Sequence, residues 1–520
     1  YYQRGITNVL LNGEHYTPDE KWEIEWKLSP TISNIVEPDL RRTPFTIDAA
    51  TGDSIFAAGQ GGNPKRIWRT LDEINAVAKL DVTRNLQAFE RNAKLKFGFS
   101  HVYKTRDYEI LDYDLQFFGA QPDFTGDPNA VLDPNLFFPD GNLYYQEQFG
   151  TPNPNQYSSN NNNLGVYTSY EFSPFLGLKA ILGLRAESFV QRHTGRSGAA
   201  AVQIRQGVSP DDLEEALEND IVLNSLDFFP SANLVYTLNE NQNLRASYFR
   251  SIARPSFKEL SFAQILDPTT NRTFNGGLFP YPGSWEGNLT ETRINNLDLR
   301  WEYFMEPGEI LSVSVFTKTF ADPIELVRIP EAQTTAEFQP RNVGDGLVYG
   351  AEFELTKGLG FINPAVKNLS FSGNFTYVFS QIDMTDVEFE ARKRFEKVGE
   401  TVENTRDMAG QAPYVVNAGF IYDNPRKQYN LGAFYNVKGR TLEVVGGGLF
   451  PDVYTEMFHS LNLSGSFSFG KDYNQTFSLK VANLLNDVRE SFFVGFRAQD
   501  QIFSQWEPGI QASISYSYNF

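Results

Sequence analysis

The chain has 520 residues, a net charge of −19 and no cysteine. The acidic balance argues against a nucleic-acid partner, which would favour a basic surface, and the absence of cysteine excludes disulfides and thiolate metal sites. Aromatic residues make up 14% of the chain, yet no segment reaches the run of about 18 to 20 apolar residues that a transmembrane helix needs.

Segments throughout the chain alternate apolar and polar residues with a period of two, which is the pattern of a β-strand with two different faces. Charged residues occupy the polar face even in the middle of these segments. The clearest examples, in chain order, are KLKFGFS (94–100), LKAILGLRAE (178–187), LDLRWEY (297–303), YGAEFEL (349–355), LSFSGNFTYVF (369–379), LNLSGSFSF (461–469), TFSLKVANLLN (476–486) and QASISYSYNF (511–520). The pattern predicts an all-β, antiparallel fold.

The connections between these segments alternate between short and long. Short, turn-like ones are predicted at 17–20, 173–176, 239–242, 306–309 and 423–428, and long ones near 31–65, 104–163, 188–225, 251–292, 320–346, 381–411, 439–458 and 486–509. This alternation is typical of a transmembrane β-barrel with short periplasmic turns and long extracellular loops. The mean hydropathy of −0.38 is compatible with such a barrel, because its strands alternate and its loops are polar.

A large β-sandwich or a propeller is the alternative, because the strands of both also alternate. Three observations favour the barrel. Phe and Tyr gather at strand ends, as in interfacial aromatic girdles, no repeat of blade length is visible, and a sandwich has no reason to place every long loop at one end.

About 17 strands are expected, with the last one ending at Phe520. Bacterial single-chain barrels have even strand numbers and no open edge, so we expect about five further strands, for a total of 22, and a plug before Tyr1. The first residues, YYQRGITNVLL, lack a starting Met and a signal region, which is the beginning expected of a processed or partial product. We therefore assign residues 1–520 to a single, partial barrel domain.

Signs of catalysis are weak. The four histidines (His15, His101, His193 and His459) are far apart and show no zinc-binding spacing, so we expect them to be solvated or at strand ends. Acidic residues in the segment 122–142, such as Asp127 and Asp133, are compatible with calcium, but turn formation explains them equally. Gly446, Gly447 and Gly448 lack the context of a phosphate loop. We expect no enzyme activity, no cofactor and no metal.

Charges on the polar faces are candidates for a wetted lumen, because a barrel of about 22 strands is too wide for its side chains to fill. These residues are expected to pair with one another, to face a plug or to line a substrate path, and they are Arg185, Glu187, Arg245, Arg300, Glu302, Glu352 and Glu354. Substrate recognition is expected in loop stretches that combine aromatic with amide and charged residues. These stretches are 137–149, 274–285 and 492–506.

Several short motifs resemble those of one membrane protein family. RSIARPSFKEL (250–260) resembles the segment in which the family has Arg-Pro, an aromatic residue and Glu-Leu. NVGDGLVYGAEFEL, with Gly350 and Glu352, resembles the family's Gly-x-Glu strand. VANLLND, with Asn483 and Asn486, resembles the strand before the family's last long loop. The final YSYNF resembles an aromatic assembly signal made by Tyr516, Tyr518 and Phe520. In this order and spacing, the chain resembles the C-terminal three quarters of a TonB-dependent outer-membrane receptor. The family's plug domain and TonB box match nothing in these residues.

The resemblance implies TonB-driven import of a scarce nutrient across the outer membrane of a Gram-negative cell, with the long loops extracellular. The implied substrates are glycans or peptides, taken up with a possible surface lipoprotein, or siderophores or cobalamin. The implied partners are outer-membrane lipid and lipopolysaccharide, TonB through the missing N-terminal region, and the barrel-assembly machinery. The alternative is a receptor-like barrel that serves as a structural or assembly scaffold.

Overall fold

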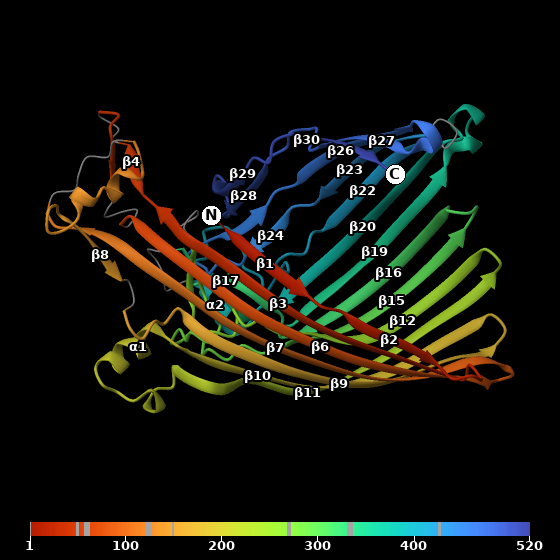
Figure 1. The fold of residues 1–520 in the computed structure, drawn as a ribbon, viewed down its shortest axis with the longest axis horizontal. Helices are drawn as coiled ribbons and strands as arrows, with labels where there is room; N and C mark the ends of the chain where they lie inside the picture. Colours follow the sequence, from red (N-terminus) through yellow and green to blue (C-terminus); the bar gives the residue numbers. More distant parts are fainter. Residues whose placement is uncertain are drawn as a thin grey trace.

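The computed structural model describes residues 2–47, 51–56, 63–119, 126–147, 150–267, 272–329, 336–424 and 428–519. Its dominant feature is one strongly curved antiparallel sheet of twenty strands, which lie side by side at a common tilt (Figure 1). The predicted all-β antiparallel fold is confirmed.

Neighbouring strands of this sheet follow one another in chain order. The sheet runs from β1 (Gln3–Asn8) and β2 (Leu11–Tyr16) through β3 (Trp22–Arg42), β6 (Lys65–Ala88), β7 (Arg91–Phe117), β9 (Gln156–Phe175), β10 (Leu178–Arg196), β11 (Ala216–Asn239), β12 (Gln242–Ala253), β15 (Thr292–Phe304), β16 (Ile310–Ala321), β19 (Gly346–Gly358), β20 (Leu369–Asp383), β22 (Tyr414–Asn424), β23 (Tyr429–Lys438), β26 (Phe458–Phe469) and β27 (Gln475–Ala482) to β30 (Gln511–Tyr518).

The predicted number of strands agrees with this order. β1 and β2 lie end to end along β3, while β8 (Leu143–Glu147) and β21 (Thr405–Arg406) are short additions beside β7 and β20. Seventeen strands therefore succeed one another across the described sheet. The expected strands and plug before residue 1 stay a prediction.

The apolar rows of the sheet are exposed, whereas many residues of the opposite face are buried. On β15, Leu297 and Leu299 are each 46% exposed, while Asn296 and Glu302 on the other face are 4% and 7% exposed. A sandwich would bury its apolar face, whereas a barrel in lipid turns that face outward. Together with the sheet order, this exposure confirms the transmembrane barrel and excludes the sandwich.

Helices are few and short. α1 (Gly198–Arg205) and α2 (Asp386–Arg394) are the two α-helices of the described residues, and neither is long or apolar enough to cross a membrane. The remaining small elements are β4 (Phe45–Ile47), β5 (Ser54–Phe56) and the 3-10 turns η1 (Ala130–Leu132), η2 (Pro134–Leu136), η3 (Pro210–Asp212), η4 (Leu359–Phe361), η5 (Pro364–Val366) and η6 (Lys471–Tyr473).

Six consecutive strands, from β3 to β11, are much longer than the rest. They contain 19 to 27 residues each, whereas about 9 to 11 residues cross a membrane. Because the turns at their other ends are short, the extra length rises on the loop side as a tall wall (Figure 1). The first three long loops were therefore predicted too long, since β3 continues to Arg42, β7 to Phe117 and β10 to Arg196.

The predicted apolar row of the last strand continues the apolar row of β27. Ile514 and Tyr516 are the Cα partners of Leu479 and Phe477, although all residues of β30 are exposed. Phe520, the final residue of the predicted assembly signal, lies outside the described residues. The signal itself stays a prediction.

A glycine allows one polar contact to span three strands. Gly98 on β7 lies between Asp81 on β6 and Tyr167 on β9 in the strand register. A Cβ at Gly98 would lie 1.9 Å from the Tyr167 ring. Without that Cβ, the ring crosses Gly98 and its hydroxyl donates to the Asp81 carboxylate at 2.5 Å.

The prediction for the histidines was wrong for two of the four. His193 is 1% exposed, and its Nδ1 lies 2.7 Å from Ser159 Oγ. Phe262, from the segment that follows β12, packs near its ring. This covering contact comes from residues distant in sequence, so the local pattern did not reveal it. His101 lies within β7 and not at a strand end.

Candidate ligand-binding site in the loop layer

The charges predicted to face the lumen form two groups on the face opposite the exposed apolar rows. On β10, Arg185 Nε lies 2.7 Å from Glu187, which also accepts from Arg254 at 2.8 Å. Arg254 belongs to the RSIARPSFKEL motif, so this motif anchors the segment after β12 to the barrel wall.

The second group crosses β12, β15 and β19. Glu302 lies 2.7 Å from Arg245 and 3.0 Å from Arg300, and Arg300 reaches Glu354 at 2.8 Å. Glu352 forms no ion pair with the described residues. Six of the seven predicted residues thus make ion pairs, although their role toward a plug or a substrate stays a prediction.

The long loops form a second layer of sheet above the barrel. One four-stranded sheet contains β13 (Gln264–Asp267), β14 (Arg272–Asn275), β18 (Ala336–Asn342) and β17 (Ile324–Arg328). The other contains β24 (Thr441–Val444), β25 (Asp452–Thr455), β28 (Arg489–Val494) and β29 (Gln501–Trp506). A parallel bridge between Val327 and Val445 joins them. We call these two sheets together with α2 the loop cap.

The loop cap has its own apolar core. Phe338, Val444 and Val453 are buried together, with Phe493 and Phe503 packed against them. Two arginines make cation–π contacts in the loop cap. The Arg272 guanidinium lies 3.4 Å from the Phe503 ring centroid, and the Arg328 guanidinium lies 3.3 Å from the Phe450 ring centroid. Four long loops are therefore packed together as one unit, and they do not extend separately into solvent.

Local signals in the sequence of α2 favour a helix that begins after Thr385. The Thr385 hydroxyl caps the helix by accepting from the Glu388 backbone N–H at 3.3 Å. Acidic residues occupy its first turn and basic residues its last turn, which complements the helix dipole. The spacing Thr385-x-x-Glu388 matches a capping box, so this helix had a signal that the strand-based analysis missed.

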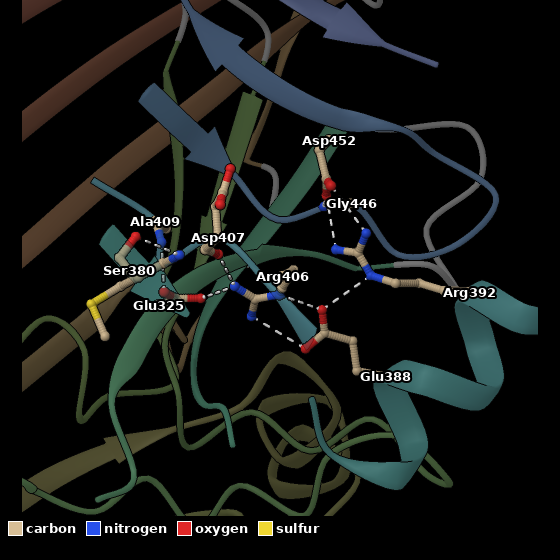
Figure 2. A network of polar contacts seen from close by, with 10 residues as sticks. Glu325, Ser380, Glu388, Arg392, Arg406, Asp407, Ala409, Gly446 and Asp452 are labelled. Atoms are coloured by element: carbon tan, nitrogen blue, oxygen red, sulfur yellow. Dashed lines mark hydrogen bonds and ion pairs between the residues drawn. The ribbon is translucent and has the colours of Figure 1, made fainter. Parts of the chain in front are cut away.

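A series of ion pairs connects α2 to Arg406 of its own loop and to two other loops (Figure 2). Glu325 on β17 lies 2.7 Å from Arg406, and Arg406 Nε lies 2.6 Å from Glu388 on the helix. Glu388 also accepts from Arg392 at 3.1 Å. Arg392 also makes a bidentate contact with Asp452, from Nη2 to Oδ1 at 2.8 Å and from Nη1 to Oδ2 at 3.0 Å.

Backbone N–H groups donate to the carboxylates at both ends of this series of ion pairs. The Ala409 N–H donates to Glu325 and the Gly446 N–H donates to Asp452, each at 2.7 Å. Although burial opposes its charged form, the carboxylates of Glu325 and Glu388 raise the pKa of Arg406 above its usual value. The charge of Arg406 is thus compensated, as a buried charge must be to persist in a protein interior, whereas burial raises the pKa of Glu325 above its usual value although Arg406 and the Ala409 N–H oppose this shift.

Beside α2 lies a cavity of about 780 Å³. Its walls come from α2 and from three loops that are far apart in the sequence. Trp285 and Arg341 form one wall, with the guanidinium 5.7 Å from the indole centroid, while Ala391 and Arg394 of α2 and the following Phe395 form another. The volume lies in the range of about 300 to 1,000 Å³ that is typical of small-molecule sites.

The electrostatics of this cavity are mixed. Arg341 is 7% exposed and donates to Gln339 Oε1 at 2.8 Å and to Ser284 Oγ at 3.4 Å. Arg394 is exposed and makes no ion pair with a described residue, whereas Asp386 and Glu390 add negative charge to the lining. The aromatic wall and the guanidinium groups suit a ligand with a planar part and anionic groups.

The three stretches expected to recognise substrate have different positions. The stretch 274–285 contributes Trp285 to the cavity. The stretch 492–506 places Phe493 and Phe503 in the core of the cap. In the stretch 137–149, Phe137 and Tyr145 stack on each other, with centroids 4.9 Å apart, beside β7. The sequence did not indicate that Arg341, Arg394 and Phe395 would join Trp285.

The family model of the TonB dependent receptor-like β-barrel matches residues 12–484. No curated protein matches the chain.

Solved structures with similar folds share little sequence identity with the chain. The ferric-catecholate import receptor Fiu from E. coli K12 is 12% identical, with a TM-score of 0.63, and the match covers 100% of this chain and 65% of that one. The siderophore receptor PiuA from Acinetobacter baumannii is 13% identical, with a TM-score of 0.60 and coverages of 99% and 64%. The ferripyoverdine receptor of Pseudomonas aeruginosa is 14% identical, with a TM-score of 0.60 and coverages of 99% and 56%.

The chain thus spans about three fifths of the length of these receptors. At this identity the likeness shows the fold, while the family model, which matches most of the chain, shows the family. This protein belongs to the TonB-dependent receptor-like β-barrel family of the bacterial outer membrane.

Proposed function

We propose that this protein is the barrel part of a receptor that imports a scarce nutrient across the outer membrane, with energy delivered through TonB. The observation that carries this proposal is the cavity of about 780 Å³, which several loops build jointly on the rigid loop cap. A loop layer that only covered the barrel would not need a shared cavity lined by a buried arginine, a tryptophan and a helix face.

Among the nutrients considered, we favour a ferric siderophore. The guanidinium groups of Arg341 and Arg394 and the Trp285 ring suit the anionic and planar groups of an iron chelate. The structural neighbours Fiu and PiuA are receptors for ferric catecholates and siderophores. The lumen charges Arg185, Glu187, Arg245, Arg300, Glu302, Glu352 and Glu354 would then face a plug or the path that the ligand follows.

Binding by the purified receptor tests this proposal. Ferric enterobactin, ferric citrate and a ferric hydroxamate serve as probes, with quenching of tryptophan fluorescence as the readout. We expect one probe to bind, and a Trp285→Phe variant to lose the quenching component of that residue. Arg394→Gln should weaken binding about tenfold, as expected for a lost charged hydrogen bond of about 1.5 kcal/mol.

Lys393→Gln is the matched control, because Lys393 adjoins Arg394 on α2 but makes an exposed ion pair with Glu396. Equal affinity in the Arg394 and Lys393 variants would contradict the proposed site. Failure of every probe, combined with stable co-purification of other outer-membrane proteins, would instead favour the scaffold function.

A further inference from the structure

Lys65 lies buried between two carboxylates near the loop-side ends of β6 and β7. Its Nζ lies 3.2 Å from Asp112 Oδ2 and 2.9 Å from Asp114 Oδ1. The side chains of Lys65 and Asp112 are only 10% and 6% exposed, whereas that of Asp114 is 21% exposed. An amine, a buried carboxyl group and a second, more accessible carboxylate thus meet at one point of the tall wall.

The register of the two strands brings these three groups together. Asp114 is the Cα partner of Lys65, and Asp112 is the Cα partner of Ile67. Diagonal neighbours across an antiparallel pair are within reach of a long side chain, so Lys65 contacts both carboxylates. Ile67 and Ile110 share the face of this cluster and are 1% and 4% exposed, which keeps bulk water away from Lys65 and Asp112.

The two carboxyl groups differ in their surroundings. Burial raises the pKa of Asp112 above its usual value, although Lys65 and Arg69 oppose this shift. Asp112 Oδ1 is also buried and accepts no hydrogen bond from the described residues. Arg42, the Cα partner of Lys65 on β3, attracts both carboxylates. Asp112 is therefore protonated more readily than an ordinary aspartate, and Asp114 lies close enough to Lys65 Nζ to exchange protons with it.

We propose that Lys65 and Asp112 condense into an isopeptide bond that joins β6 to β7, with Asp114 as the proton carrier. One proton of the Lys65 ammonium passes to the Asp112 carboxylate, and the neutral Nζ attacks Cγ of the resulting carboxylic acid. Asp114 takes a second proton from Nζ in the tetrahedral intermediate and returns it to the leaving hydroxyl. A C–N bond forms, a C–O bond of Asp112 breaks and one water leaves, and nothing is oxidised or reduced.

The position of the cluster favours this condensation. The desolvation cost of a buried ion pair can exceed the attraction between its charges, and the reaction replaces such a pair by a neutral amide. Two groups held in contact react with an effective molarity of about 10⁵ to 10⁸ M, and a positioned proton carrier contributes about 10² to 10⁴-fold. Arg42 and Asp114 remain afterwards as charges of opposite sign.

The bond would brace the wall where it rises above the membrane. β6 and β7 meet at the short turn between Ala88 and Arg91, and about 9 to 11 residues from such a turn suffice to cross the membrane. Lys65 is the first of the 24 residues of β6, so the link lies at the far end of this strand. The chain has no cysteine, and an isopeptide bond supplies the covalent link that a disulfide cannot.

Intact-mass spectrometry of the full receptor, purified from membranes and denatured, tests this proposal. We expect a mass about 18 Da below the value calculated from the sequence, because one water is lost. Tandem mass spectrometry of a tryptic digest should find a branched peptide that joins Lys65 to Asp112. The proposal concerns the wall and not the imported ligand, so it can fail while the proposed import stands.

The variants identify the three groups. Lys65→Arg and Asp112→Ala should show their full calculated masses, and Asp114→Asn should leave most of the protein unlinked. Asp112→Asn should lose about 17 Da, because ammonia leaves in place of water. Lys79→Arg is the control and should keep the loss of about 18 Da, since Lys79 lies 2.8 Å from Asp81 but its side chain is 42% exposed.

The mass of the wild-type protein decides the question even if a variant fails to fold. A full calculated mass would overturn the proposal. The same holds for a loss of water that the digest locates at other residues, or for a loss that persists in Lys65→Arg.

Discussion

Replacing Glu388 with Gln removes the carboxylate that Arg406 and Arg392 share in the loop cap. Glu388 accepts from Arg406 Nε at 2.6 Å, from Arg406 Nη2 at 3.2 Å and from Arg392 Nε at 3.1 Å. The Arg406 side chain is only 6% exposed, so its charge would lose one of two carboxylate partners in a poorly solvated place. Gln keeps one acceptor oxygen but not the charge.

The expected cost is about 2 to 3 kcal/mol, because hydrogen bonds to charged groups contribute about 1.5 to 3 kcal/mol each and Gln retains part of this. Removing one partner of a buried ion pair altogether costs about 3 to 5 kcal/mol. The barrel does not depend on this network, so the loss should appear as local opening of α2. Backbone amides of residues 389–394 should exchange with deuterium about 30 to 150 times faster.

Hydrogen exchange with mass spectrometry measures this directly, and Lys393→Gln is the control. Lys393 makes an exposed pair with Glu396 at 2.7 Å, and exposed pairs contribute at most about 1 kcal/mol. Exchange in Glu388→Gln that is less than threefold faster, or no faster than in Lys393→Gln, would refute the view that the ion chain holds the helix.

Three further predictions concern the barrel and its wall. Leu463→Arg, on the lipid face near the middle of β26, should cost about 2 to 4 kcal/mol of folded barrel, whereas Ser464→Arg on the opposite face should be tolerated, as measured by urea unfolding in detergent; equal losses would contradict the assignment of faces. An epitope tag inserted at Gly126 should bind antibody on intact cells, while a tag at Asn424 should need permeabilised cells, and surface labelling at Asn424 would invert the orientation. In the wall, hydrogen bonding from Arg66 lowers the pKa of Asp39 to about 2, so the stability that this pair contributes is present above the ordinary value of about 4 and is lost as pH falls toward 2. Fluorescence of Trp68, whose ring lies 4.9 Å from the Arg66 guanidinium, should report this change in wild type but not in Asp39→Asn, with a Trp68→Phe variant providing the background.

The sequence allowed the barrel to be predicted because the period of two is a local property. Rows such as Leu297, Leu299 and Trp301 specify one face of a strand without reference to any other strand. The number of strands, the short turns and the two faces could therefore be predicted from such rows. The ends of β7 and β10 were placed too early, since Arg106, Asp107 and Glu109 lie above the lipid, where both faces of a strand are polar.

The loop cap could not be predicted in this way. Its strands contain only four to seven residues, and it depends on contacts such as Val327 with Val445 and Arg272 with Phe503, which join loops more than 100 residues apart. The cavity could not be predicted from the sequence for the same reason, because Trp285, Arg341 and Arg394 come from three different loops. Only α2 had a local signal, the capping box at Thr385 and Glu388.

Energy-dependent uptake is the most direct test of the proposed import. Cells that carry the native gene or its deletion are supplied with an iron-55 complex of the siderophore identified by binding, with and without an ionophore that collapses the proton gradient. Import through this receptor predicts accumulation of iron that requires both the gene and the gradient and that falls in the Arg394→Gln variant. Accumulation that persists in the deletion strain, or that is unaffected by the ionophore, would contradict it.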